Sequence, residues 1–123
     1  AHIDKVAGDR RGGCHCGAVR FAFYAPVIRE GLRCNCSICV KKGALMSNFF
    51  LAPDALQITA DGASLASYQF SSHIAEHYFC QHCGIYTFHK ARRMPGHYRV
   101  NLGCVEGLDS LSLPVVLADG ALF

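Results

Sequence analysis

The sequence predicts a mainly β protein built from short strands. Short segments rich in aromatic and β-branched side chains recur along the chain. Glycine, proline and serine separate these segments at fairly regular spacing, which is typical of β-sandwiches, barrels and folded sheets. Only two short stretches have the character of a helix.

The expected strands follow one another along most of the chain. The first, AVRFAFYA at 18–25, follows the turn GGCHCG and combines aromatic with branched residues. LQITAD at 56–61 alternates polar and apolar residues and ends at Gly62, as a half-buried strand does. The complete set of expected strands is 18–25, 44–52, 56–61, 64–70, 74–80, 85–91 and 97–105.

Two helical turns are expected between these strands. The stretch SICVKKG at 37–43 would form one turn that ends at Gly43. PDAL at 53–56 begins with a proline, which suits a first helical turn. Because the chain of 123 residues contains no repeat, long linker or low-complexity segment, we expect a single domain over 1–123.

Composition argues against several classes of function. The net charge of +3 is small, and the basic residues are scattered as RR and KK pairs, so we do not expect a nucleic-acid partner. The longest apolar runs, such as FFLA and LPVVLA, are too short to span a bilayer. The opening AHIDKVAGDRRGG lacks the apolar core of a signal peptide. We therefore expect a cytoplasmic protein without membrane contact.

The eight cysteines point to metal binding. Spacings such as CHC and CQHC bring two sulfurs together on one turn, which suits a tetrahedral ion with Zn–S bonds of about 2.3 Å. A disulfide between such close neighbours would close a small, strained ring. A disulfide framework is the alternative in a secreted chain. We favour zinc, although sulfur-rich sites also accept iron.

Two cysteine doublets together supply four ligands. Cys14 and Cys16 form the first doublet, Cys80 and Cys83 form the second, and a glycine that permits a tight turn follows each of them. Four thiolates close the tetrahedral shell of a structural zinc. Such an ion would tie the early strands to the late ones and stabilise a small core, because metal binding is coupled to folding.

The triplet Cys34, Cys36 and Cys39 supplies three ligands of its own. Three protein ligands and one exchangeable position form the arrangement of a catalytic zinc, which can bind water, a thiolate or a carbonyl oxygen. Lys41 and Lys42 follow at once and would help to keep the thiolates ionised. For these lysines we favour the simpler interpretation of a solvated turn.

The eighth cysteine, Cys104, has three interpretations. It, or one of the seven histidines, would close a second structural site by supplying a fourth ligand to the triplet. It would be a reactive thiol if it lay near a pocket. We favour a small buried residue in a strand.

The motifs in this order resemble a known family. GGCHCGAVRF, CNCSICVKKG, YFCQHCGIYTF and YRVNLGCVEGLD are similar to motifs of the glutathione-dependent formaldehyde-activating enzyme family, which also includes centromere protein V. The similarity runs from about Gly12 to Asp109. The segment after the second doublet, IYTFHKARRMPGHYRVNLGCVEG, resembles the short bacterial members of the family.

The resemblance implies a fold, two zinc ions per chain and an activity. The fold would be a β-tent of folded antiparallel sheets, and the activity that of a carbon–sulfur lyase that condenses formaldehyde with glutathione to S-hydroxymethylglutathione. The implied zinc ligands are Cys14, Cys16, Cys80 and Cys83 at the structural site, and Cys34, Cys36 and Cys39 at the catalytic site.

Proton transfer in this reaction would need a general acid or base, and a histidine titrates near working pH. The candidates are His73, His77, His89 and His97. His15 and His82 lie inside the two cysteine doublets, so we expect them to support the structural zinc through hydrogen bonds.

Other groups are candidates for contacts around the triplet. Arg92 and Arg93 would meet the carboxylates of a glutathione-like ligand, although we favour a solvated loop for them. Tyr98 and Asn101 share an expected strand and would face opposite sides, so at most one should point at a pocket. Backbone N–H groups at 37–41 would donate to the sulfurs, because the first turn of a helix leaves its amides free.

Competing functions remain at this point. One is a zinc-dependent enzyme that acts on a glutathione–aldehyde adduct or a similar small thiol or aldehyde. The alternative is a catalytically silent, zinc-stabilised binding module. The enzyme needs an exchangeable ligand on the triplet's metal, whereas the module would have a fourth protein ligand there. A redox or metal-buffer role for the triplet is a third interpretation.

Overall fold

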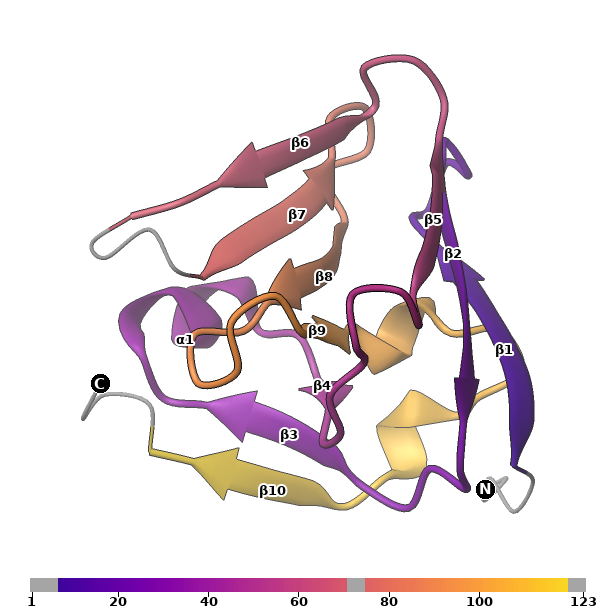
Figure 1. Ribbon diagram of the computed structural model, residues 1–123. Coiled ribbons are helices and arrows are strands. Elements are labelled where there is room, and N and C mark those ends of the chain that lie inside the picture. Colours follow the sequence, from indigo (N-terminus) through magenta and orange to yellow (C-terminus); the bar gives the residue numbers. More distant parts are fainter. Residues whose placement is uncertain (1–6, 71–74, 120–123) are drawn as a thin grey trace.

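Three small sheets make up the computed structural model, which describes residues 7–70 and 75–119 (Figure 1). The first sheet has the order β1-β2-β5, with β1 at Gly8–Gly13, β2 at Val19–Ala25 and β5 at Gln57–Ala60. Both of its strand pairs are antiparallel. Buried and less buried residues alternate along β2, so one face of this sheet packs against the core.

The second sheet has the order β10-β3-β4 and includes the only parallel pair among the described strands. Its strands are β3 at Gly31–Cys34, β4 at Met46–Ser47 and β10 at Val115–Ala118. β3 pairs antiparallel with β4 and parallel with β10. The pairing brings the segment near the end of the chain beside the strand that leads into the cysteine triplet.

The third sheet is fully antiparallel and has the order β6-β7-β8-β9. Its strands are β6 at Leu65–Tyr68, β7 at Glu76–Cys80, β8 at Tyr86–Lys90 and β9 at Tyr98–Val100. Figure 1 shows this sheet at the upper left, the first sheet at the right and the second at the bottom. The helix α1, at Ser37–Lys42, follows β3 directly.

The core lies where the first and third sheets meet. Phe21 of β2 packs edge-on against Phe88 of β8, with ring centroids 5.8 Å apart. Phe88, which is fully buried, also meets the Tyr98 ring edge-on at 5.7 Å. Such aromatic pairs add packing specificity to the burial of apolar area. Within residues 7–70 and 75–119, no helix is both long and apolar enough to cross a membrane.

The prediction of a mainly β fold with antiparallel sheets is confirmed. The predicted helical turn after the cysteines is also present, and it ends at Gly43 in the left-handed conformation, with φ 68°. The helical turn expected at 53–56 is wrong, because residues 53–55 form a turn that belongs to no helix. Residue 74, the first of the expected strand 74–80, lies outside the described residues.

Two expected strands were too long. The stretch 44–52 contains only the two residues of β4 and an isolated bridge from Leu51. The stretch 97–105 leaves the sheet after Val100, because the Asn101 side chain accepts a hydrogen bond from the Gly103 amide and starts a 3-10 turn. Three further strands, β1, β3 and β10, were not expected from the sequence.

Candidate metal centres and the adjoining cavity

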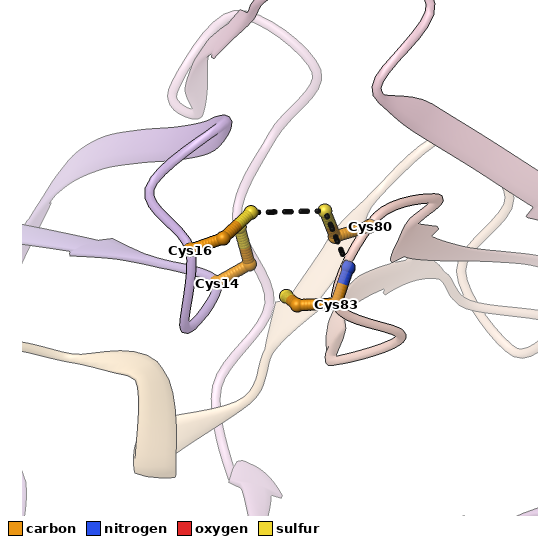
Figure 2. Close-up of side chains that lie close together, drawn as sticks. All are labelled: Cys14, Cys16, Cys80 and Cys83. Carbon is orange, nitrogen blue, oxygen red and sulfur yellow. Dashed lines mark hydrogen bonds between the residues drawn. The ribbon is translucent and has the colours of Figure 1, made fainter.

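The two doublets meet in space and bring four sulfurs together, as Figure 2 shows. All four Sγ atoms lie within 4.8 Å of one another. Cys16 Sγ lies 3.6 Å from both Cys14 Sγ and Cys80 Sγ. Sulfurs around a tetrahedral zinc are about 3.8 Å apart for bonds of about 2.3 Å, whereas a disulfide needs about 2.05 Å. The spacing therefore fits one shared ion, and all eight cysteines are free.

Backbone amides surround this quartet of Cys14, Cys16, Cys80 and Cys83. The Val19 amide donates to Cys14 Sγ at 3.3 Å. The amides of His82 and Cys83 donate to Cys80 Sγ at 3.3 and 3.5 Å. These donors stabilise thiolates, which are the forms that bind a metal.

The same turns depend on two glycines and favour an ionised thiol. Gly17 and Gly84, which follow the doublets, have φ values of 85° and 77°, where a side chain would be strained. A hydrogen bond from the Cys16 amide, and a second from the Ile85 amide, lower the pKa of Cys83 to about 6. Cys83 therefore loses its proton readily when a cation binds.

The rings of the two histidines beside the quartet, His15 and His82, make no hydrogen bond to its sulfurs. His15 is exposed. The His82 ring lies 3.2 Å from Ser64 Oγ through Nε2, and only its backbone amide reaches a sulfur. The support expected from these imidazoles comes instead from the backbone.

The triplet also converges. Cys34 ends β3, Cys36 is the residue before α1, and Cys39 lies within α1. Their three sulfurs lie within 4.8 Å of one another, and all three residues are half-buried. In the part of the chain that the structure describes, no other Cys, His, Asp or Glu joins this group. The fourth protein ligand expected for a closed site is therefore not found among these residues.

The surroundings of the triplet shift the pKa values of two of its thiols in opposite directions. Burial raises the pKa of the Cys36 thiol, but donors outweigh it, namely the Cys39 side chain and the amides of Cys39 and Ile38, so the pKa is lowered overall. Burial raises the pKa of Cys39 to about 12, although Lys42 opposes this shift. The predicted hydrogen bonds from helix amides are not formed as capping bonds, because the Cys36 side chain accepts none at the start of α1. A cation would have to displace the proton that Cys39 retains.

The triplet forms part of the wall of a cavity of about 410 Å³. Apolar side chains such as Leu32, Met46 and Phe50 line it together with basic and imidazole groups. No carboxylate belongs to the described residues that line it. The basic and imidazole side chains of the lining are Lys42, His77, His89, Arg92, Arg93 and Arg99. Such a wall attracts an anionic ligand.

The interpretation of the two lysines as part of a solvated turn is wrong for Lys42, which is half-buried. It holds for Lys41, which is exposed. Lys42 Nζ lies 3.0 Å from the Tyr86 hydroxyl oxygen, Oη, and 4.2 Å from the centre of the Tyr86 ring. Arg92 and Arg93 line the cavity, so a purely solvated loop does not describe them either. Arg99, which the sequence analysis missed, donates to a backbone oxygen of β4 at 2.7 Å.

Two predicted histidines meet at the cavity. His77 of β7 and His89 of β8 are cross-strand partners, so their side chains share one face of the sheet. Tyr86 Oη lies between them, 2.6 Å from His77 Nδ1 and 2.8 Å from His89 Nδ1. The sequence analysis did not single out Tyr86. A register shift between Tyr78 and Phe79 interrupts the regular alternation of β7 and β8, so residue spacing alone could not place this hydroxyl.

The remaining candidates are not part of the cavity wall. His97 contacts a neighbouring backbone oxygen at 3.4 Å and is not a lining residue. Tyr98 is buried in the core, and Asn101 donates to a backbone oxygen of β8 at 2.8 Å. Neither residue lines the triplet's cavity. This agrees with the prediction that at most one of the two would point into a pocket. His73 lies outside the described residues.

Cys104 belongs to a 3-10 turn, Leu102–Cys104, and not to a strand as expected. It packs against the core, and its Sγ lies 3.6 Å from the Tyr86 backbone oxygen. Burial, and then the nearby Cys14 and Cys83, raise its pKa to about 11. The expected buried strand residue is thus a half-buried residue in a turn, and Cys104 is neither a fourth ligand of the triplet nor a lining residue of the cavity.

Comparison with known proteins agrees with this geometry. The family model described as glutathione-dependent formaldehyde-activating enzyme matches residues 9–115. A curated protein from Halomonas elongata, named provisionally for the same enzyme, is 39% identical over 80 residues, which are 58% of this chain. The match covers 50% of that protein, so the chain spans about half the length of this curated relative.

A solved structure extends the similarity to the fold. The crystal structure of a Rhodobacter sphaeroides protein is 34% identical and superposes with a TM-score of 0.76. The alignment covers 86% of this chain and 99% of that one. Sequence and fold together place the chain in one family. It belongs to the glutathione-dependent formaldehyde-activating enzyme family.

Proposed function

We propose that this chain is a zinc-dependent enzyme of the carbon–sulfur lyase type, which joins a small thiol to an aldehyde. Glutathione and formaldehyde are the substrates that the family name suggests. One observation carries the proposal. Three converging thiols, with no fourth ligand among the described residues, lie in the wall of a cavity of about 410 Å³. Cavities of this size suit small substrates.

Zinc fits the triplet because all three donors are sulfurs and because the pKa of the Cys36 thiol is lowered. Cys34, Cys36 and Cys39 would hold the ion. A zinc with one open position lowers the pKa of a bound thiol or polarises a carbonyl oxygen. The protein's own contribution is to hold both reactants together in a cavity and so remove the entropic cost of their encounter.

The basic wall supports a substrate that carries carboxylates. Glutathione has two of them, and guanidinium groups bind carboxylates in a planar, two-pronged geometry. Arg92, Arg93 and Arg99 all line the cavity, and no lining residue in the described ranges carries a negative carboxylate. The charge of the wall therefore matches the charge of the proposed thiol.

We also propose a second, structural zinc on Cys14, Cys16, Cys80 and Cys83, which would hold the chain together as a single domain. The spacing of 3.6 Å between neighbouring sulfurs supports it. The full proposal is two zinc ions per chain, bound in a reducing compartment such as the cytoplasm, where thiols stay available.

Metal analysis and a rate measurement test the proposal together. We expect two zinc ions per chain in the wild type and one in a Cys36→Ser variant, with the fold retained. Wild-type protein should form S-hydroxymethylglutathione from glutathione and formaldehyde faster than buffer does, and Cys36→Ser should not. Cys104→Ser is the matched control, because Cys104 lies outside the triplet, and it should keep both ions and the activity.

Two results would count against the enzyme. A wild-type rate equal to that of buffer would reject the reaction and leave the silent binding module, which would still contain two ions. A Cys36→Ser variant with full activity would show that the triplet is not the reacting site.

A further inference from the structure

The hydroxyl of Tyr86 lies at the centre of a compact polar cluster beside the triplet. Its oxygen is 2.6 Å from His77 Nδ1, 2.8 Å from His89 Nδ1 and 3.0 Å from Lys42 Nζ. Lys42 Nζ is also 3.4 Å from His89 Nδ1. These contacts join β7, β8 and α1 at one point of the cavity wall.

The protons in this cluster can be assigned by counting donors and acceptors. A tyrosine hydroxyl has one hydrogen and two lone pairs, and a lysine ammonium only donates. Tyr86 Oη can donate its one hydrogen to only one of the two Nδ1 atoms, and the Lys42 ammonium, 3.0 Å from Tyr86 Oη and 3.4 Å from His89 Nδ1, favours the bare nitrogen on His89. The bare His89 Nδ1 then accepts the Tyr86 hydrogen. Because the Tyr86 hydrogen is directed at His89, the hydrogen bond between His77 and Tyr86 must be donated by His77 Nδ1–H and accepted by Tyr86 Oη.

This assignment gives the two imidazoles opposite tautomers. His77 has its hydrogen on Nδ1 and a free lone pair on Nε2, whereas His89 has its hydrogen on Nε2. Neither Nε2 atom makes a hydrogen bond to another described residue. Among the described side chains, every nitrogen that is fully shielded from solvent has a hydrogen-bond partner, so neither Nε2 atom is fully shielded. Since both residues line the cavity, each Nε2 is accessible from it. The cavity thus has one acceptor and one donor side by side.

We propose that His77 and His89 are the general base and the general acid of the reaction, and that Tyr86 and Lys42 set their protons. This inference rests on the proposed function. His77 Nε2 accepts the proton of the substrate thiol, and His89 Nε2–H protonates the aldehyde oxygen. Tyr86 and Lys42 are positioning residues, because they act through the imidazoles.

The step balances without any further reactant. The sulfur electron pair forms the S–C bond, and the π pair of the carbonyl moves to its oxygen, which takes the proton from His89 Nε2. His89 Nδ1 then takes the Tyr86 hydroxyl proton, and Tyr86 takes the Nδ1 proton of His77. His77 has gained the thiol proton on Nε2, so both rings end neutral with exchanged tautomers. Before the next turnover, solvent water protonates His89 Nε2 and takes the proton from His77 Nε2, while the relay through Tyr86 runs backwards and restores the first state.

The electrostatics of the cluster agree with neutral rings. Burial, and then Lys42, lower the pKa of His77 to about 4. Burial, and then Lys42, His77 and Arg99, hold the pKa of His89 well below its ordinary value. Burial raises the pKa of Tyr86, so the hydroxyl keeps its proton at neutral pH. An uncharged imidazole is the form that can both give and take a proton in this way.

Nitrogen NMR of the zinc-loaded protein with ¹⁵N-labelled histidine tests the assignment without any substrate. At pH 7.5, we expect His77 protonated on Nδ1 and His89 protonated on Nε2. In Tyr86→Phe the hydroxyl is lost, and His77 should change to the Nε2–H form. Tyr24→Phe, at a tyrosine that is 65% exposed, should leave both rings unchanged. Identical tautomers on the two wild-type rings, or no change in Tyr86→Phe, would overturn the inference.

A rate measurement then tests the catalytic role. If the wild type turns over glutathione and formaldehyde, Tyr86→Phe should lower kcat on the order of tenfold to a hundredfold. Its KM should stay within about twofold, because Tyr86 does not touch the substrate. An unchanged kcat would overturn the role while leaving the proposed function intact. If the wild type shows no turnover, the proposed function and the catalytic role fail together, even where the tautomers agree.

Discussion

Arg99 is held in position by the protein before any ligand arrives. Its guanidinium donates to the Ser47 backbone oxygen at 2.7 Å and lies 4.0 Å from the centre of the Phe50 ring. Burial, and then the charge of nearby Arg93, lower the pKa of Arg99. Two cations that repel each other in one cavity are both stabilised by an anion that binds between them. Arg99 is therefore the side chain on which carboxylate binding should depend most.

Replacement of Arg99 by Gln should weaken binding of a carboxylate-bearing thiol selectively. A hydrogen bond to a charged group contributes roughly 1.5–3 kcal/mol, so KM for glutathione should rise about tenfold or more. KM for 2-mercaptoethanol, which has no carboxylate, should change little. Steady-state kinetics with both thiols makes the comparison, and Arg29→Gln at an exposed position outside the cavity is the control. An equal rise in KM for both thiols would show a general structural defect instead.

At the scale of elements, the short helix α1 matters most to the site. It has six residues, and the groups at its start lower the pKa of the Cys36 thiol. Lys41 and Lys42 lie in its last turn, where positive charge suits the negative end of the helix. Gly43 ends it with φ 68°, and the Gly43 amide donates to the Cys39 backbone oxygen at 3.2 Å. The glycine thus directs the chain away after the third sulfur.

The Gly43→Ala variant should therefore be less stable than the wild type by about 1–2 kcal/mol, because a Cβ is strained in the left-handed conformation. Space is not the cause, since no heavy atom lies within 4 Å of the position that the Cβ would take. Urea denaturation of the zinc-loaded protein measures the loss. Gly43→Asn is the matched comparison and should lose less, because asparagine tolerates this conformation. Equal stability of the wild type and Gly43→Ala would contradict the argument.

At the scale of the whole molecule, the quartet links parts of the chain that are distant in sequence. Cys16 and Cys80, whose sulfurs lie 3.6 Å apart, are separated by 64 positions. One comes from the turn between β1 and β2, and the other ends β7, so a shared ion would join the first sheet to the third (Figure 2). A metal that closes so long a loop removes much of the entropy of the unfolded chain.

Loss of the structural ion should unfold the protein. Structural zinc contributes on the order of 10 kcal/mol in small zinc domains, which is comparable with the whole stability of a domain of this size. We expect Cys83→Ser to lose the cooperative thermal transition in circular dichroism, and a strong chelator to do the same to the wild type. Cys36→Ser, which affects only the triplet, should keep a transition close to that of the wild type. If both variants melted alike, the division into a structural and a catalytic site would be wrong.

The sequence by itself determined what depends on short spacing. The doublets and the triplet could be identified because residues two or three positions apart place their sulfurs on one turn, whatever the rest of the chain does. The end of α1 at Gly43 could be predicted for the same local reason. The strands of the third sheet were also found, since their aromatic and branched residues mark them.

Only the tertiary structure decided what depends on register and on distant pairing. β10 pairs in parallel with β3, and no local pattern specifies a partner more than 80 positions away. Arg99 and Lys42 reach one cavity from different elements. His77 and His89 become an acid–base candidate pair because the strands align them and an irregularity in that alignment brings in Tyr86. Local spacing thus determined the candidate metal ligands, whereas the side chains around them are brought together by long-range packing that a linear pattern does not encode.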